Sequence, residues 1–235
     1  MNNRLLIIII TSVLISIEGT AQDRISADRP GAGYSASTVP AKMFYVEAGA
    51  SINEGQSDIG QFFLRTGLSK DFEFQLNTGS LLFVDALDKP RVSAQSLAFK
   101  YSIGAFQDNK LQLSFFSRTN LPVFNDDFEY YLTRFMVLGD YSVNDIWSIN
   151  SNFGYGDFVN GLKNGSFNFN ITPGFSINEH TGGYFGYAVI FDENFSNDLV
   201  EGGIVYFLDN SFQVDGGFIY TPNDLFVSFG VAKSF

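Results

Sequence analysis

Apolar and small or polar residues alternate along the chain, most clearly at its end. Leu225, Val227, Phe229 and Val231 stand at every second position, and Ser228, Gly230 and Ala232 stand between them. Because successive side chains of a strand point to opposite faces, this period of two predicts a strand with one apolar face. In an outer-membrane barrel, such a strand would close against the first strand and turn its apolar face to lipid. The residues expected at this closure are Phe229, Val231 and Phe235.

The same alternation continues almost without a break from Met43 onward. It predicts an all-β fold, a transmembrane antiparallel up-and-down β-barrel of about twelve strands, each near the ~9–11 residues that cross a bilayer at a tilt. Pro173 falls inside one strand, where it cannot donate a ladder hydrogen bond, and we expect a bulge there. The expected strands are 43–52, 60–69, 72–83, 91–103, 110–119, 130–142, 147–156, 166–177, 181–191, 199–208, 211–220 and 225–235.

The connections between these strands support a barrel independently, because short and long ones mostly alternate. Outer-membrane barrels have short periplasmic turns and longer outer loops. With an even number of strands, this assignment places both termini in the periplasm. The short connections are 70–71, 104–109, 143–146, 178–180 and 209–210, and the longer ones are 53–59, 84–90, 120–129, 157–165, 192–198 and 221–224.

The first 42 residues do not follow this pattern. Arg4 precedes an apolar run that starts at Leu5, and Gly19-Thr20-Ala21 offers small residues for cleavage, so residues 1–21 are expected to be a signal peptide. An uncleaved membrane helix is the alternative, but the run is short for one. Residues 22–42 are polar and form an expected periplasmic leader, which could enter the barrel mouth as a plug. Residues 43–235 are the expected outer-membrane barrel.

A secreted soluble β-sandwich would also alternate, because each of its strands has one face on a core. The signal peptide, strand lengths, even count, turn asymmetry and terminal Phe together favour the membrane barrel. Beyond the signal, no segment approaches the ~20 apolar residues of a membrane helix. A chain that enters a membrane with strands must close its sheet, because only closure satisfies every backbone polar group in lipid.

Composition agrees with a strand-rich protein and limits its chemistry. The chain has 27 Phe, 23 Gly and 11 Tyr, which favour strands and tight turns over helices. Its net charge of -11 argues against a nucleic-acid partner, which would require a basic surface. The absence of Cys removes thiol catalysis, thiolate metal sites and disulfides.

Candidate catalytic groups are few. The single His, His180, lies in an expected periplasmic turn beside Asn178 and Glu179. A His acting as a general base would need a nearby Ser whose hydroxyl it could activate, and a single imidazole offers only one of the several ligands of a metal site. We therefore expect a solvated turn residue, no enzyme activity, no cofactor and no metal.

The charged residues of the strands are more informative, because the alternation places them inside. Four are positive and five negative, a balance that does not predict strong ion selectivity. One interpretation is a polar pathway in which Arg65, Arg118 and Arg134 orient a solute. The favoured alternative is a network of ion pairs that fills a narrow interior. The expected lumen-lining residues are Glu47, Arg65, Glu73, Lys100, Arg118, Arg134, Asp140, Glu201 and Asp215.

Three glycine pairs, Gly182-Gly183, Gly202-Gly203 and Gly216-Gly217, fall in successive strands. Glycine weakens a strand unless the backbone must bend or another segment approaches closely. One hypothesis is that this patch makes room for the leader, with Arg24 or Arg29 reaching Glu201 or Asp215. Local curvature of the barrel is the simpler alternative.

Aromatic residues near strand ends fit the girdles that barrels place at both membrane interfaces. They could also line a path for a hydrophobic solute, although girdles explain most of them. These residues are Tyr45, Phe72, Tyr101, Tyr130, Tyr141, Trp147, Tyr155, Tyr206 and Tyr220.

The stretch from Asp28 to Gly49 resembles a known family. Asp28-Arg29-Pro30, then Thr38-Val39-Pro40 and an aromatic-rich strand with Glu47 and Gly49, are similar to the outer-membrane barrels named for meta-pathway phenol degradation or described as transporters. Ala41-Lys42 stands where members often have Lys-Gly. The resemblance implies a barrel that passes small, hydrophobic or aromatic molecules, and it does not imply a phenol enzyme.

These observations predict a protein of the bacterial outer membrane for the passive passage of small molecules. The alternative is a closed barrel with a structural or surface-interaction role, in which loops 120–129 and 157–165 carry the function. The expected partners are outer-membrane lipid, the barrel assembly machinery through the C-terminal strand, and a small hydrophobic solute.

Overall fold

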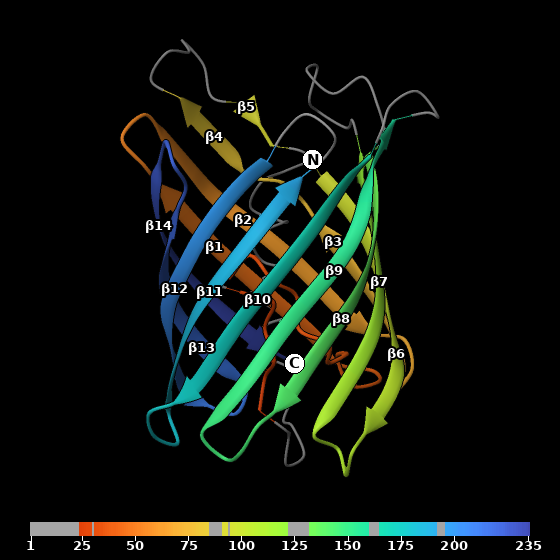
Figure 1. Cartoon of the computed structure of the whole chain (residues 1–235). Helices are drawn as coiled ribbons and strands as arrows, with labels where there is room; N and C mark the ends of the chain where they lie inside the picture. Colours follow the sequence, from red (N-terminus) through yellow and green to blue (C-terminus); the bar gives the residue numbers. More distant parts are fainter. Residues whose placement is uncertain are drawn as a thin grey trace, which may run out of the picture.

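The computed structural model describes residues 24–29, 31–84, 91–93, 95–121, 132–159, 165–191 and 196–235. Its strands form one antiparallel sheet that closes on itself (Figure 1). Among the described residues, no helix is long and apolar enough to cross a membrane. The strands are β1 (Phe44–Ile52), β2 (Gln56–Gly67), β3 (Phe72–Asn77), β4 (Leu81–Val84), β5 (Arg91–Val92), β6 (Gln95–Phe106), β7 (Leu111–Leu121), β8 (Leu132–Ser142), β9 (Trp147–Val159), β10 (Ser166–Ser176), β11 (Thr181–Phe191), β12 (Ser196–Asp209), β13 (Phe212–Tyr220) and β14 (Leu225–Ser234).

These fourteen segments make twelve barrel strands, as expected. The third barrel strand is interrupted: β3 pairs with the second half of β2, and β4 pairs with its first half. Gly79, between β3 and β4, has a φ of 77°, and Gly60 within β2 has a φ of 79°. These left-handed conformations suit glycine and bend the sheet at this point. The fourth barrel strand is likewise divided into β5 and β6, and β2 begins at Gln56 rather than at residue 60.

The first and last strands close the barrel. β1 pairs with β14 along its whole length, with Ala50 opposite Phe229 and Ala48 opposite Val231. The terminal Phe235 exchanges two backbone hydrogen bonds with Phe44, of 2.8 and 3.0 Å. With this pairing the first and last strands of the barrel leave no open edge toward each other, as a bilayer requires.

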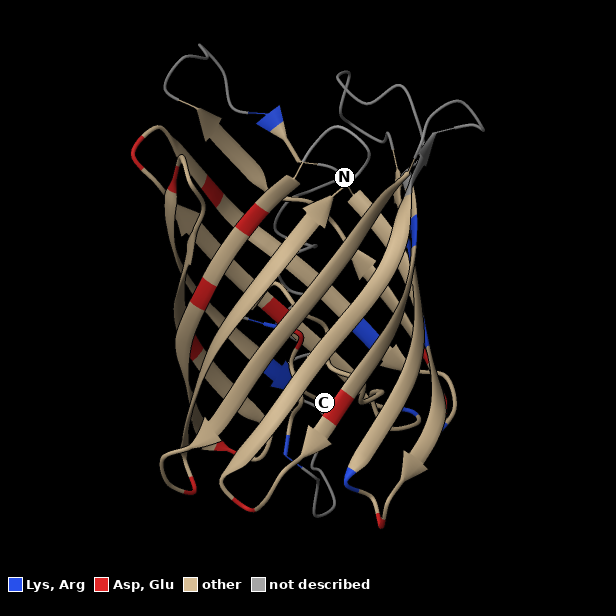
Figure 2. Ribbon diagram, viewed as in Figure 1, with Lys and Arg blue, Asp and Glu red and all other residues tan. Residues whose placement is uncertain are grey.

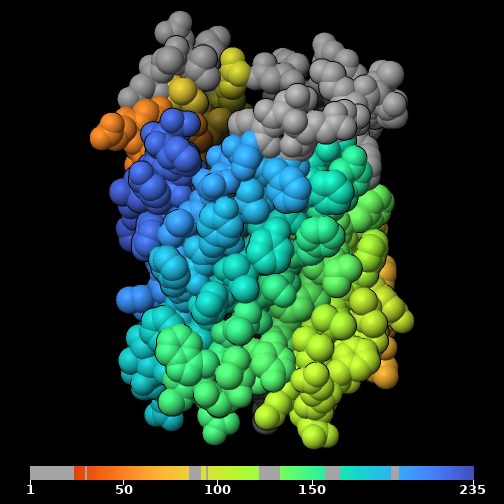
Figure 3. Space-filling view, in the orientation of Figure 1, coloured from red at the N-terminus to blue at the C-terminus, as the bar shows by residue number. Residues whose placement is uncertain are grey.

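Apolar side chains face outward from this barrel and polar ones face inward. Phe229 is 59% exposed and Phe185 57%, whereas Glu47, Glu73 and Lys100 are fully buried. Charged positions are few along the strands in Figure 2, and side chains of neighbouring strands cover the near face in Figure 3. This is the arrangement of a transmembrane barrel and the reverse of a soluble sandwich.

Two expectations about single strands are wrong. The register of β10 is the same on both sides of Pro173, with Ile171 opposite Tyr187 and Gly174 opposite Tyr184, so there is no bulge. The ladder with β11 skips Thr172 and Pro173 instead, which accommodates the missing N–H without an added residue.

Tyr45 is the second correction, because it is buried rather than part of an outer girdle. It shares the inward face of β1 with Glu47, and the Arg65 guanidinium lies 5.6 Å from its ring. Tyr130 lies outside the described residues, and Phe72 and Tyr155 are partly buried. The exposed aromatic residues of the expected set are Tyr101, Tyr141, Trp147, Tyr206 and Tyr220.

Candidate functional site: the leader inside the barrel

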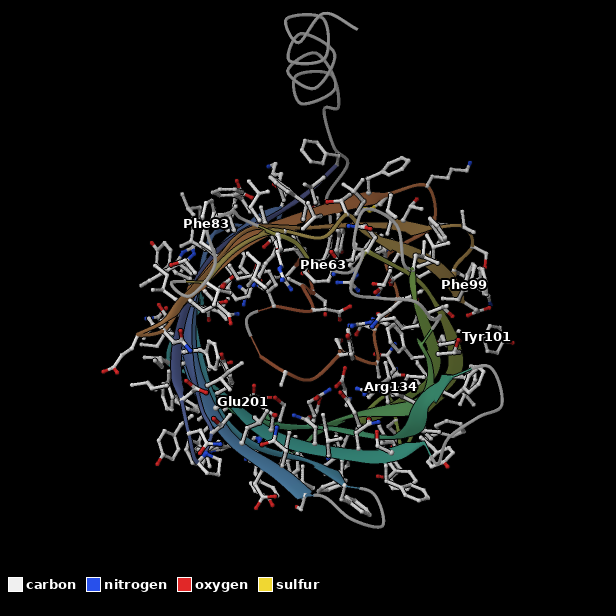
Figure 4. The ribbon with its side chains drawn as sticks, turned by 90° about the horizontal axis from the view of Figure 1, so that it is seen from above. Phe63, Phe83, Phe99, Tyr101, Arg134 and Glu201 are labelled. Carbon is white, nitrogen blue, oxygen red and sulfur yellow. The ribbon has the colours of Figure 1, made fainter. Side chains whose placement is uncertain are left out.

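The described leader residues, 24–29 and 31–42, lie inside the barrel (Figures 1 and 4). The leader starts at the short-turn end, where Ile25 N donates to Asn210 O at 2.8 Å. It leaves at the same end, where Lys42 N donates to Gly67 O at 2.9 Å. Between these points it contacts strands on all sides of the interior. The leader therefore enters the barrel and returns before β1 begins.

The leader also contributes residues to the apolar core of the interior. Ala36 packs in a buried cluster with Ala98, Phe116, Met136 and Leu138. Ile25 and Val39 form a second cluster with Tyr45 and Ala232. Burial of this apolar surface, at roughly 25 cal/mol per Å², favours the docked leader.

Asp28 joins a buried network of charges from four strands. Arg65 on β2 lies 2.8 Å from Glu47 on β1, 2.8 Å from Glu73 on β3 and 3.4 Å from Asp28. Lys100 on β6 lies 3.3 Å from Asp28 and 3.9 Å from Glu73. Arg65, Lys100, Glu47 and Glu73 are almost completely buried. Buried charges require such partners, and the geometry favours the ion-pair interpretation for these residues.

Arg29 occupies the place where the barrel closes. It donates to Gln61 Oε1 at 2.9 Å and to the carbonyl of Phe229 at 3.0 Å, and it lies 3.7 Å from Asp215. Gly49 and Gly230 are partners across the β1–β14 seam, and a Cβ on either would overlap the Arg29 guanidinium. Two glycines at this seam therefore make room for the arginine. The pair of Arg29 with Asp215 is one of those suggested by the sequence.

The middle of the leader approaches the opposite wall through hydrogen bonds that its uncharged backbone N–H groups donate. Ala32 N donates to Glu201 Oε2 at 2.5 Å, and Ala36 N donates to Asp140 Oδ2 at 2.8 Å. A Cβ on Gly33 would lie 2.7 Å from the Oδ1 atoms of Asn150 and Asn170. The glycine therefore leaves room for these two amide groups beside the leader.

Tyr34 connects the leader to β7. Its ring stacks on Phe116 with centroids 4.4 Å apart, and its hydroxyl accepts a hydrogen bond from Arg118 Nη1 at 2.5 Å. Its backbone carbonyl accepts from the amides of Asn150 and Asn152. The sequence pattern did not single out these asparagines, although their positions on the polar faces of strands marked them as inward.

All nine charged residues expected inside are buried or partly buried. Glu47, Arg65, Glu73, Lys100, Glu201 and Asp215 are buried, and Arg118, Arg134 and Asp140 are partly buried. Figure 4 shows Arg134 and Glu201 on the inner side of the ribbon and Phe99 and Tyr101 on the outer side. Arg118 and Arg134 are direct partners in the β7–β8 ladder.

The glycine pairs do not make room for the leader. The nearest atoms to Gly183 belong to the Phe175 ring, those to Gly202 belong to Phe218, and Gly203 and Gly217 lie beside the Tyr184 hydroxyl. Aromatic rings from neighbouring strands occupy the space that side chains at these glycine positions would fill. The hypothesis that this patch receives the leader is wrong, and Gly49 and Gly230 have that role.

Among the described residues, three cavities that lie beside the leader are each lined by Arg29. A cavity of about 360 Å³ extends toward the short turns beside Ser176 and Gly182. One of about 210 Å³ lies in the middle beside Asp140 and Glu201, and one of about 250 Å³ lies beside Ser51 and Ile219, toward the long loops. The cavities follow one another along the barrel.

His180 is remote from these cavities. Its ring lies in the β10–β11 turn, with Nδ1 3.1 Å from Phe207 O and Nε2 3.6 Å from Glu179 Oε1. None of the described residues form a group of His, Asp and Glu suited to a metal ion.

The closed sheet, apolar outside and polar inside define a transmembrane β-barrel. Its fold is similar to that of an outer-membrane channel from Pseudomonas putida F1, with a TM-score of 0.66 and 11% identity over 88% of this chain and 99% of that chain. The KdgM porin in complex with disordered oligogalacturonate aligns with a TM-score of 0.63 and 9% identity over 81% and 99%. The NanC porin gives 0.61 and 8% over 81% and 98%.

At these identities the likeness concerns the fold alone. No family model matches the chain, and no curated protein matches it.

Proposed function

We propose that this protein is a channel of the bacterial outer membrane, with both termini in the periplasm, through which small molecules pass beside the leader. The observation that supports this proposal most is the row of three cavities, all lined by Arg29, from the short turns toward the long loops. The outward apolar face suits lipid contact. The C-terminal strand, which completes the closure, is the segment that we expect the barrel assembly machinery to bind.

The walls of the cavities contain both polar and apolar groups, so the solutes that they suit are not restricted to the hydrophobic or aromatic ones that the family resemblance implies. The middle cavity is lined by carboxylate, amide and hydroxyl groups, including those of Glu201, Asn150 and Thr172. Apolar side chains line the cavities on either side of it, such as Phe63 toward the long loops and Phe175 toward the short turns. A solute with polar groups on a small apolar frame fits both environments.

A structural role is the second candidate, and the buried ion pairs favour it. Arg65 and Lys100 are committed to carboxylates, so neither is free to orient a solute. The outer loops that would then carry the function, 120–129 and 157–165, lie largely outside the described residues. The two candidates differ in whether the barrel conducts.

The test is the conductance of the protein, purified in detergent from outer membranes, in a planar bilayer. The proposal expects reproducible single-channel steps. Deletion of residues 24–40 should increase their size by about twofold or more, because it removes chain from the bore. The matched control is Glu54→Gln in the exposed β1–β2 loop. A silent protein that still runs as a folded, heat-modifiable band would favour the structural role, and a deletion without effect on conductance would contradict the place of the leader in the path.

A further inference from the structure

We propose that the path beside the leader prefers cations to anions, and that Glu201 and Asp140 are the residues that determine this preference. The inference rests on the proposed channel function and names the class of solute that the channel takes: inorganic cations and small molecules that carry an amine. The nine interior charges suggest no such preference when they are only counted. The structure separates those that are neutralised from those that are not.

The cations in the middle of the barrel are all occupied by carboxylates. Arg29 faces Asp215, while Arg65 and Lys100 together face Glu47, Glu73 and Asp28. Two cations therefore neutralise three carboxylates in the larger group. This part of the interior has no excess positive charge to attract an anion.

Glu201 and Asp140 receive only neutral donors among the described residues. Glu201 accepts from Ala32 N, from Thr172 Oγ1 at 2.9 Å and from Asn170 Nδ2 at 3.4 Å. Asp140 accepts from Ser35 Oγ at 2.9 Å, from Ala36 N and from Asn150 Nδ2 at 2.6 Å. Both residues line the middle cavity of about 210 Å³. The middle cavity thus has two carboxylates that no cation among the described residues neutralises.

A further carboxylate oxygen independently indicates a cationic occupant. Glu47 Oε2 is buried and accepts no hydrogen bond, whereas Asp215 Oδ1, which also accepts none, lies 3.7 Å from Arg29 Nη2. Glu47 is completely buried and lines the cavity toward the long loops. A buried oxygen of this kind is costly unless a donor or a cation reaches it. An ammonium group or a hydrated metal cation in that cavity would supply the missing partner.

The remaining cations of the described interior lie toward the two ends of the path. Arg118 and Arg134 are close to the long-loop ends of β7 and β8, and Arg24 lies at the short turns. A carboxylate in the interior of the barrel influences a passing ion more than a charge at a solvent-facing end, because water and salt screen the latter. The middle of the path therefore determines the preference.

The experiment is the reversal potential of the same bilayer preparation in a KCl gradient. We expect a permeability ratio of K⁺ to Cl⁻ above one, and a decrease of about threefold or more in Glu201→Gln, since a charge is lost within a few ångströms of the ion. Gln keeps an acceptor for Ala32 N, so the leader stays docked. Asp140→Asn should act in the same direction and provides a second test if the first variant folds poorly. Glu54→Gln should leave the ratio unchanged.

The outcomes separate the two proposals. A conducting protein that prefers Cl⁻, or whose ratio does not change in either interior variant, would overturn the cation preference and leave the channel function standing. A folded but silent protein would overturn both. A decrease of the ratio in Glu201→Gln with unchanged step size would support the carboxylate as a selectivity residue rather than as an anchor of the leader.

Discussion

The two walls of the barrel interior hold the leader in different ways. On the wall of β1, β2, β3, β6 and β13, Asp28 and Arg29 are held by buried ion pairs. On the wall of β8, β9 and β12, the leader is held by hydrogen bonds that its uncharged backbone N–H groups donate to Asp140, Asn152 and Glu201. The wall with the ion pairs is suited to stability, because removal of either partner would leave the other charge buried and unpaired. The opposite wall keeps uncompensated carboxylates beside a cavity, which is suited to binding a solute.

The largest loss of stability is expected from a substitution in the wall with the ion pairs. Arg65→Ala leaves Glu47 and Glu73 buried without their cation, and we expect a loss of about 3–5 kcal/mol in the free energy of unfolding. Urea unfolding in detergent micelles, followed by the heat-modifiable band, would measure it. Lys70→Ala, which removes an exposed ion pair with Asp71, should change stability by less than about 1 kcal/mol. Equal losses in the two variants would contradict the expectation that the buried ion pairs stabilise the protein more than the exposed one.

A smaller effect is expected at the seam. Gly230→Ala places a methyl group where the Arg29 guanidinium lies and should displace it from Phe229 O and Gln61. We expect a loss of about 1–3 kcal/mol, the usual contribution of hydrogen bonds to a charged group.

The matched control at the seam is Gly55→Ala, whose new Cβ would meet no atom within 4 Å and which should be neutral within about 0.5 kcal/mol. If Gly230→Ala is also neutral, the position of the Arg29 guanidinium does not depend on the space that the missing Gly230 side chain leaves.

The smallest effect concerns the link between the leader and β7. Tyr34→Phe removes the hydroxyl that accepts from Arg118 but keeps the ring on Phe116, and it should cost about 0.5–1.5 kcal/mol. Arg118→Ala should cost a similar amount and also change the step size in the bilayer experiment. A double mutant with additive losses would show that the two side chains do not interact.

The sequence predicted the parts of this fold that depend on a simple period. Alternation placed Glu47, Arg65 and Glu201 inside, and the polar faces of the strands contain them, because a charge on lipid is costly whatever its neighbours are. The strand count and the closure of β14 on β1 followed from the same rule. The break at Gly79 was missed, because one glycine in an apolar run does not show whether its φ is positive.

The leader shows what a period cannot predict. Its polar sequence has no repeat, so nothing in it indicated that Ala36 and Val39 would enter apolar clusters. Tyr45 was assigned to a girdle from its aromatic character, although its parity with Glu47 placed it inside. The double glycines drew attention to β11, β12 and β13, whereas the single glycines that face Arg29 are separated by 181 positions in the chain and come together only at closure.

The position of Arg29 links two equilibria. Its hydrogen-bond partners come from β2 and β14, which lie on either side of β1, so the site for the arginine exists only when the first and last strands are paired. By thermodynamic reciprocity, docking of the leader must strengthen the pairing of β1 with β14 by the same free energy with which that pairing strengthens docking. A factor that withdraws the leader would therefore also weaken the seam. Without the docked leader, the first and last strands of the barrel would separate more often.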